Sequence, residues 1–421
     1  MTSVRNLRLR LNGNKWVGCS IAIILLIAGC TPKVRVLRGP GDKTTPTTEE
    51  SKEAEKRAEI ESEEAKVDKN HIALLLPFEL DKANPHAPST ADIKRSALAL
   101  DFYQGFKLGL DALVEKEGSH FKVNVLDTRD DVSENARVAK LEEVQQAALV
   151  VGPVFPKEIQ VFGFNADLKN ALQISPLAAS MPSEFNIPNL VTITPPITAH
   201  VNGLAKHIAR QYRTGDVVVL YQTQDAASKQ FLSPLKAAIL RADKSINVEE
   251  VSDEEGLDRT VRLSGKNLVV LGTTNAYQLS PILAQLTKLQ EELSYDIRLF
   301  GHPNWAKLDF QGGVGLAGLR TYITTSYYID QSDPRVRTFD QHYRKTYGVA
   351  PTEFAYKGYD AAFYFGGLLA KYGADYKKHV ADNRYDGLHN AFEFEYNPAW
   401  GYVNNAVSIL QYRAGSFQPL P

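Results

Sequence analysis

Cysteine is almost missing from this chain of 421 residues, which contains only Cys19 and Cys30. Because both lie near the N-terminus, the sequence beyond residue 30 can form neither a disulfide nor a cysteine-based zinc site. Burial of apolar side chains must then supply the stability, and a body of about 350 residues is large enough for this. The sequence therefore predicts a globular body held together by packing alone.

An excess of charge of one sign is also missing. The 48 Lys and Arg residues are balanced by 49 Asp and Glu residues, which gives a formal net charge of −1. Proteins that bind nucleic acid electrostatically carry a basic excess. The composition therefore gives no basis for nucleic acid as a partner.

Motifs of common enzymes are scarce. The chain has no G-x-S-x-G elbow and no P-loop, and His200 and His207 do not form a His-Glu-x-x-His pattern. Asp130 and Asp131 offer the paired acids of a glycoside hydrolase. Acids at the expected start of a helix, however, also complement the helix dipole, and this is the simpler interpretation. We expect no enzyme, and hence no catalytic residues, metal site or cofactor.

The first 29 residues have the pattern of an export signal. Positive side chains precede an apolar run at 16–29 that is too short for a comfortable permanent membrane span. The Ile27-Ala28-Gly29-Cys30 step resembles the lipobox of bacterial lipoproteins. In that family the cysteine thiol receives a diacylglyceryl group, the signal is removed, and the new N-terminus is acylated. A plain signal peptide or short anchor with an incidental cysteine is the alternative.

By this resemblance Cys30 is the lipidation site, and the chain is a lipid-anchored protein of the cell envelope. Two or more acyl chains hold a protein durably on a membrane. Thr31 follows the cysteine, in place of the aspartate that resembles an inner-membrane retention signal. The resemblance therefore implies the outer membrane, facing the periplasm, rather than the inner membrane.

Residues 30–70 form a lipidated N-terminus and a charged spacer in this interpretation. Gly39-Pro40-Gly41 and the threonine-rich 44–48 have linker composition. The stretch 49–69 combines Glu, Lys, Arg and Ala with almost no large apolar side chain. Since it has no apolar face to bury, a solvated spacer is expected.

From His71 onward, short apolar runs alternate with segments at helical spacing. Expected strands lie at 72–77, 122–127, 147–151, 172–175, 190–194, 216–221, 267–272 and 296–301, and expected helices at 98–113 and 133–143. Strands that alternate with helices in this way predict parallel βαβ units covered on both faces. These strands are too many for one small sheet, so we expect two α/β lobes.

The order of these pieces resembles the type I periplasmic-binding-protein fold of branched-chain amino-acid binding proteins and receptor ligand-binding domains. The marks that carry the resemblance are Ile72–Pro77, Asp101–Phe106, Asp127-Thr128, Val150–Pro153, Ile174–Pro176, Gly301 with Trp305, Phe339–Pro351 and Ala355–Ala361. The resemblance implies a Venus-flytrap arrangement, in which a hinge of about three crossovers joins two lobes. Lobe 1 is expected to hold 71–196 and 325–384, and lobe 2 is expected to hold 197–324 and 385–421.

In open α/β sheets, ligands bind beyond the carboxyl ends of the strands. In lobe 1 this position contains the amides of Val154 and Phe155, which we expect to favour a carboxylate because Pro156 suits a helix start. Ser175 and Ser180 offer hydroxyls for a ligand headgroup. Tight turns without any ligand would explain both loops equally well.

The matching loops of lobe 2 contribute Tyr221, Asp225, Asn275 and Trp305 as ligand-binding candidates. Asp225 offers a partner for an ammonium group, although a solvated loop acid is the simpler interpretation. Trp305 either stacks on a ligand or packs at the rim of the lobe.

Two positions depart from the pattern of the family. Amino-acid binders have hydroxyl residues where this chain has Val154 and Phe155, and Leu177 stands where a small residue is usual. The resemblance therefore does not support a simple zwitterionic amino acid. The apolar cleft loops favour a peptide-like or partly apolar ligand, within a class of small amino-acid, amide or peptide-like molecules.

Two functions remain open. The first is a lipid-anchored solute-binding protein that closes on a small molecule for uptake or sensing, with an ABC-transporter permease as partner. The alternative, similar to the outer-membrane lipoprotein activators of penicillin-binding proteins, is a scaffold for a peptidoglycan synthase whose cleft carries no transported solute. Those activators have a helical-repeat domain before the lobes, and residues 30–70 are too few to form one.

Overall fold

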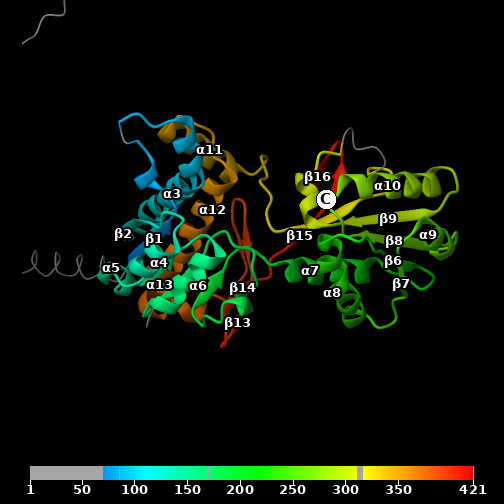
Figure 1. Ribbon diagram of the computed structural model, residues 1–421, viewed down its shortest axis with the longest axis horizontal. Helices are drawn as coiled ribbons and strands as arrows, with labels where there is room; N and C mark the ends of the chain where they lie inside the picture. The colour runs from blue at the N-terminus through cyan, green and yellow to red at the C-terminus, as the bar shows by residue number, and fades with distance from the viewer. Residues whose placement is uncertain (1–69, 85, 169–170, 311–315, 421) are drawn as a thin grey trace, which may run out of the picture. The chain divides into compact units, whose positions relative to one another are not determined.

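The computed structural model describes residues 70–84, 86–168, 171–310 and 316–420, which form two α/β lobes (Figure 1). Lobe 1 is built on a seven-stranded sheet of order β13-β14-β5-β4-β3-β1-β2, and lobe 2 on one of order β16-β15-β10-β9-β8-β6-β7. All strand pairs of the two sheets are parallel except β13–β14, β10–β15 and β15–β16. This confirms the two-lobed fold. Cys30, the signal peptide and the spacer up to residue 69 lie outside the described residues.

Lobe 1 contains the following strands: β1 (His71–Leu76), β2 (Lys122–Asp127), β3 (Leu149–Val151), β4 (Leu172–Ser175), β5 (Leu190–Thr192), β13 (Phe394–Asn397) and β14 (Gly401–Asn404), with β11 (Tyr385–Asp386) and β12 (Ala391–Phe392) as a separate pair. Its longer helices are α3 (Thr90–Glu117), α4 (Val132–Val138), α5 (Glu142–Gln145), α6 (Pro156–Asn165), α11 (Pro334–Tyr347), α12 (Glu353–Ala361) and α13 (Gly367–Tyr372). Lobe 1 also contains the 3-10 helices η1 (Leu80–Lys82), η2 (Pro182–Glu184) and η6 (Gly373–His379) and the π-helix η5 (Ala362–Gly366).

Lobe 2 contains the strands β6 (Val217–Tyr221), β7 (Val248–Val251), β8 (Lys266–Leu271), β9 (Asp296–Gly301), β10 (Tyr322–Thr325), β15 (Ser408–Arg413) and β16 (Ser416–Pro419). Its helices are α7 (Ile197–Gln211), α8 (Ala226–Ala242), α9 (Glu254–Thr260), α10 (Ala276–Glu291) and the short η3 (Pro303–Lys307). The expected strands at 122–127, 172–175 and 296–301 are found with the same bounds. The expected helix at 133–143 is instead divided into α4 and α5.

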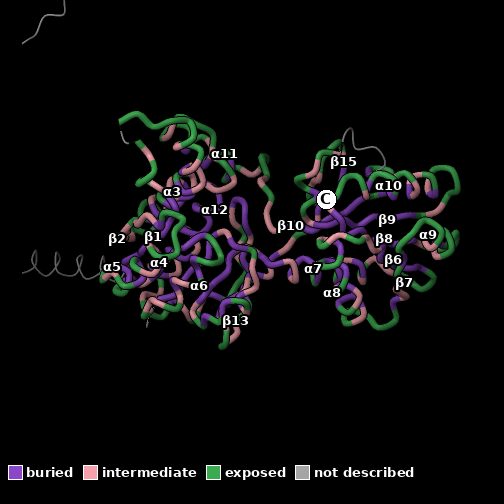
Figure 2. Tube along the Cα trace, viewed as in Figure 1, coloured by how far each residue is buried: buried purple, intermediate pink, exposed green. Residues whose placement is uncertain are grey.

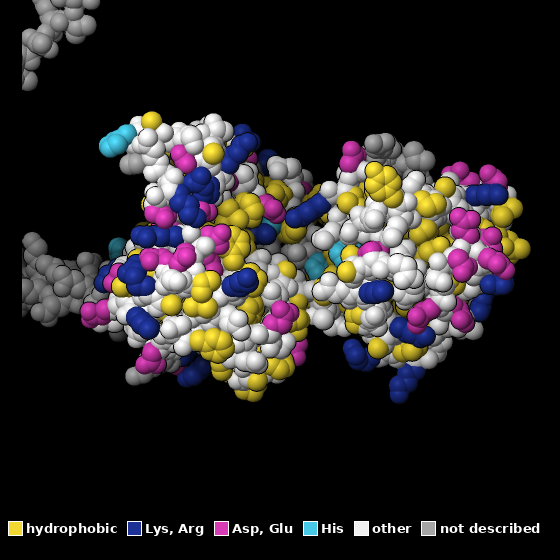
Figure 3. Space-filling model, in the orientation of Figure 1, with side chains coloured by type: hydrophobic (Ala, Val, Ile, Leu, Met, Phe, Trp, Pro, Cys, Tyr) yellow, Lys and Arg dark blue, Asp and Glu magenta, His cyan; other side chains and the backbone are white. Residues whose placement is uncertain are grey.

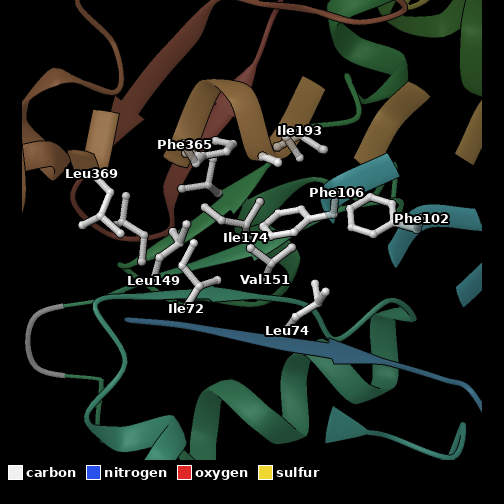
Figure 4. Packing of buried hydrophobic residues seen from close by; sticks show 14 of the residues in the cluster. Ile72, Leu74, Phe102, Phe106, Leu149, Val151, Ile174, Ile193, Phe365 and Leu369 are labelled. Carbon is white, nitrogen blue, oxygen red and sulfur yellow. The ribbon is translucent and has the colours of Figure 1, made fainter. Parts of the chain in front are cut away.

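Both faces of each sheet are covered, because the strands carry apolar side chains in both directions. In lobe 1, Ile72 and Leu74 face α3 and α12, whereas Ala73 and Leu75 face α4 and α6. Figure 4 shows how Phe102 and the other labelled side chains, which come from α3, the strands, the residue after β5, η5 and α13, meet in the first of these layers. In lobe 2, α9 and α10 cover one face and α7 and α8 the other. The buried strands form the centre of each lobe (Figure 2).

Helix α3 begins earlier than expected because Ser89 and Asp92 form a reciprocal capping box. It then crosses α12 so closely that glycine is required on both helices. A Cβ on Gly105 would lie 1.8 Å from the carbonyl oxygen of Ala355, and one on Gly358 would lie 2.1 Å from that of Phe102. Backbone therefore packs directly on backbone at this crossing.

Three crossovers join the lobes, at 193–196, 326–333 and 405–407. The third lies later than the expected boundary between 384 and 385, so that part of the prediction is wrong. Strands β13 and β14 still belong to lobe 1, because β14 pairs with β5 through Tyr402 and Val191. Tyr402 also packs in the core of lobe 1.

A buried carboxylate holds the loop before β12. Asp360 on α12 is fully buried and accepts backbone N–H groups from Leu388, His389 and Asn390 at 2.7, 2.9 and 2.8 Å. This loop in turn bonds the second crossover, since Tyr328 N–H donates to the carbonyl of His389 at 3.1 Å. Burial raises the pKa of Asp360 to about 6 despite these three donors.

The close helix crossing makes a prediction about stability. Gly105→Ala or Gly358→Ala should lower the free energy of unfolding by about 1–3 kcal/mol, because each methyl group would force two backbones apart. Gly367→Ala is the matched control, since its Cβ would meet only a side-chain carbon at 3.6 Å. Chemical denaturation measures all three, and equal midpoints for the three variants would contradict the proposed close contact.

Candidate functional site

The carboxyl ends of the lobe 1 strands carry buried hydroxyl groups. Thr128 follows β2, Ser175 ends β4, and Thr194 lies two residues beyond β5. Each hydroxyl oxygen is buried and has no hydrogen-bond partner among the described residues. Buried polar atoms are normally satisfied, so unsatisfied hydroxyls at the carboxyl ends of the strands mark candidate binding positions. Ser175 and Thr194 belong to the neighbouring strand ends of β4 and β5, whereas Thr128 follows β2, which β3 and β1 separate from β4.

The start of α6 differs from the prediction. Val154 is almost fully buried in the core of lobe 1, and Phe155 is the N-cap residue of α6, with its side chain exposed. The Phe155 N–H donates to the Glu158 carboxylate at 3.5 Å. Of the two amides that we expected to favour an anion, the Phe155 amide is therefore engaged by the chain's own carboxylate.

Glu158 was missed in the sequence, although an acid at the third position of a helix that begins with proline is a capping signal. Only 2% of Glu158 is exposed, and its Oε1 atom has no partner within the described part of the chain. Burial, together with the nearby Asp130, raises the pKa of Glu158 to about 7. A carboxyl group with a pKa of about 7 is about half protonated at neutral pH.

Of the two serines predicted at the end of β4 and in the loop after it, only Ser175 is fully buried at the strand ends. Ser175 is fully buried, whereas Ser180 is half-buried and lies beyond Leu177, which packs against the core. Ser175 ends β4 and pairs with Thr192 at the end of the neighbouring strand β5, which Thr194 follows by two residues. The sequence indicated Ser175 correctly as a strand-end hydroxyl.

In lobe 2, two of the predicted residues are helix caps. Asp225 caps α8 by accepting the Ser228 N–H at 3.0 Å and the Thr223 hydroxyl at 2.7 Å. Asn275 caps α10 by accepting the Tyr277 N–H at 3.0 Å. Tyr221 ends β6 and is buried in the core of lobe 2. The side-chain oxygen of each cap is thus used for local structure.

Trp305 packs inside lobe 2 rather than at its surface. The side chain is fully buried, its indole N–H donates to the carbonyl of Thr273 at 2.8 Å, and its ring lies against Gly301. A Cβ at Gly301 would lie 2.1 Å from that ring, which explains the glycine. The ring therefore packs within lobe 2, and a contact between Trp305 and a ligand stays a prediction.

Nearby histidines in lobe 2 are held neutral. His200 on α7 bonds the Thr324 hydroxyl at 3.0 Å, and His302 accepts the Asn304 N–H at 3.1 Å. Burial lowers the pKa of each to about 4. These rings therefore bring no positive charge to the strand ends at neutral pH.

Other features of the described residues bear on binding partners. They contain no cluster of three or more metal-ligating side chains, and none of their helices has the length and apolar character that crossing a membrane requires.

A G-x-G-x-x-G run stands at 313–318, but its described part, from Leu316, forms a turn before β10 instead of a helix. On the face shown in Figure 3, basic and acidic side chains are interspersed over both lobes.

Comparison with known proteins supports the fold. The sequence pattern of the periplasmic binding protein family matches residues 94–395. A branched-chain amino-acid transporter protein from Rhodopseudomonas palustris has a similar structure, with TM-score 0.58, 14% identity, and 84% of this chain and 96% of that one covered. A putative one from Rhodospirillum rubrum gives TM-score 0.57 and 18% identity, with 83% and 99% covered.

A third similar structure is the C-domain of LpoA from Haemophilus influenzae, described as a regulator of PBP1A. Its TM-score is 0.51 at 14% identity, with 83% of this chain and all of that domain covered. No curated protein matches the sequence. At these identities the structures show a shared fold and leave the ligand open.

The buried Glu158 predicts a pH effect on stability. Its pKa is about 7 in the folded protein and about 4.5 in the unfolded chain, so the unfolded state loses its proton first as pH rises. Glu158 therefore reduces stability progressively between about pH 4.5 and 7, by up to about 3 kcal/mol.

Glu158→Gln should remove this loss. Urea unfolding at pH 5 and pH 8 should show the variant gaining stability relative to the natural protein as pH rises. Glu134→Gln, at the first turn of α4, is a suitable control because an ion pair with Arg137 lowers the pKa of Glu134. A difference between Glu158→Gln and the natural protein that does not change with pH would show that Glu158 is ionised in the fold.

Proposed function

Since the chain belongs to the periplasmic-binding-protein family, we propose that it is a solute-binding protein of the cell envelope that closes on a small amide or peptide-like molecule. The proposal includes a lipid anchor on Cys30 and a role in uptake or sensing. In the uptake role its protein partner is a transporter permease. Binding, and not catalysis, is the proposed activity.

One observation carries the proposal. Thr128, Ser175 and Thr194 place three unsatisfied hydroxyl oxygens at the edge of lobe 1 where ligands of open α/β sheets bind. A hydroxyl both donates and accepts a hydrogen bond, so this edge suits amide N–H and C=O groups equally. A fold with two lobes joined by three crossovers can enclose such a ligand by a hinge motion.

The occupied start of α6 restricts the class of ligand. Glu158 engages the Phe155 amide, so a free α-carboxylate would compete with Glu158 for that amide at the start of α6. A second carboxylate beside Glu158 would also meet like charge above pH 7, where Glu158 is ionised. These features favour an uncharged amide or peptide group over a zwitterionic amino acid.

The same observation gives some support to a second function. A binding-protein fold whose start of α6 is filled by its own Glu158 has lost the usual contact for a ligand carboxylate. In the alternative proposal the chain is an outer-membrane scaffold that activates a peptidoglycan synthase, a penicillin-binding protein. The similar LpoA domain is described as a regulator of PBP1A, and at 14% identity that likeness supports the fold alone.

A ligand screen tests the first proposal. Residues 31–421 should unfold at a higher temperature with short peptides or peptide amides, and less so with free amino acids. A ligand at about 100 times its Kd adds about 2.7 kcal/mol of stability. Ser175→Ala should weaken that stabilisation, whereas Ser332→Ala, in the second crossover, should not change it.

No shift with any peptide, amide or amino acid would contradict solute binding and favour the scaffold. In that case binding of residues 31–421 to a purified penicillin-binding protein is the next measurement. A shift with free amino acids alone would contradict the proposed ligand class and leave the binding function intact.

The lipid anchor has its own test. Cys30→Ser should abolish labelling with a radioactive fatty acid and release the protein from the membrane fraction. Thr31→Asp should leave labelling unchanged and move the protein from the outer to the inner membrane. Persistent membrane association of unlabelled Cys30→Ser would indicate a plain hydrophobic anchor.

A further inference from the structure

A cavity of about 550 Å³ lies beside the second crossover. We name it the crossover pocket. Its lining comes from lobe 2, from Thr325 and residues 327–329, and from Glu353 and His389 of lobe 1. Of the eight ligand-binding residues predicted from the sequence, only Trp305 lines it, and the hydroxyls proposed above to bind solute do not. Aromatic side chains dominate the lining: Trp305, Phe310, Tyr327, Tyr328, Tyr412 and Phe417.

One buried side-chain polar atom in this lining has no hydrogen-bond partner among the described residues. His389 is 3% exposed, and its Nε2 atom makes no hydrogen bond to any described residue. The Nδ1 atom lies 2.7 Å from Asn390 Oδ1, which can only accept, so Nδ1 carries the proton. The Nε2 atom is therefore an acceptor that requires a donor.

Contacts between residues of the second crossover and of lobe 1 hold one wall of the pocket in shape. The rings of Tyr327 and His389 stack at 4.8 Å and 4°, and Tyr356 continues the stack on His389 at 6.3 Å and 17°. Tyr327 also forms a β-bridge with Asn390. A ligand would therefore meet a preformed aromatic wall and lose little binding energy to rearrangement.

The charges around the pocket cancel. The ammonium groups of Lys307 and Lys357 lie 5.9 and 5.6 Å from the centre of the Tyr327 ring. Asp309 and Glu353 line the pocket, and Glu353 pairs with Lys357 at 3.9 Å. Two cations and two acids leave no net charge to select a charged ligand.

We propose that the crossover pocket is a second binding site, which takes an uncharged aromatic molecule that donates one hydrogen bond to His389 Nε2. The aromatic lining supplies apolar contact and ring stacking, and the buried acceptor supplies specificity for the donor. Because the lining includes both lobes and a crossover, occupancy of this site would join the lobes at the hinge. The site is independent of the solute site proposed above.

Indole and 1-methylindole form a matched pair of probes, since only indole has an N–H donor. Residues 31–421 contain two tryptophans, Trp305 in the pocket and Trp400 outside its lining. With 15N-labelled tryptophan the protein gives two indole cross-peaks, which Trp400→Phe assigns. Unlabelled indole should shift the Trp305 peak in a saturable way and leave the Trp400 peak unchanged.

The methylated probe should bind about fivefold more weakly, which is the expected effect of one neutral hydrogen bond. His389→Phe keeps an aromatic ring for stacking and should make the two probes bind equally. Ser175→Ala, at the lobe 1 strand ends, should leave the indole titration unchanged.

An unmoved Trp305 peak at saturating indole would overturn the proposal, as would equal affinity of the two probes for the natural protein. The same holds if His389→Phe retains the preference for indole, or if Ser175→Ala weakens indole binding. If His389→Phe does not fold, the comparison of the two probes on the natural protein decides. Failure here leaves the solute-binding proposal untouched, because that proposal rests on other residues and other ligands.

Discussion

The Asp360 carboxylate is the contact on which the joint between the lobes depends. It is fully buried and accepts three consecutive backbone N–H groups from the loop before β12. Without it these N–H groups would be buried and unsatisfied, which is costly. The loop places His389 against Tyr327 and bonds the second crossover. One side chain therefore fixes the hinge segment and the wall of the crossover pocket.

Asp360 reaches this loop because α12 lies so close to α3. Gly105 and Gly358 allow the two backbones to touch, and the pair covers one face of the lobe 1 sheet. Larger residues at either glycine would raise α12 away from the sheet, and the carboxylate with it. The sequence marks around Gly105 and Asp360, which resemble the family, thus have a common physical cause in this crossing.

The same fold treats its two lobes differently at the strand ends. In lobe 1, hydroxyls at Thr128, Ser175 and Thr194 stay unsatisfied, whereas Glu158 engages the start of α6. In lobe 2, Asp225 and Asn275 are used as helix caps. A polar residue at the expected position therefore does not identify a ligand contact, because a helix cap uses the same side-chain oxygen that a ligand would need.

By itself the sequence determined the class of fold, because apolar strands and helical periodicity are local and are read directly from the chain. It indicated β2, β4 and β9 with their exact bounds and Ser175 as a strand-end hydroxyl. Tertiary structure decided that β13 and β14 return to lobe 1 and that Trp305 is buried. It also decided that Glu158 Oε1 and His389 Nε2 are buried without a hydrogen-bond partner among the described residues. These outcomes depend on contacts between residues far apart in the chain, where packing and desolvation, and not local propensity, set the energy.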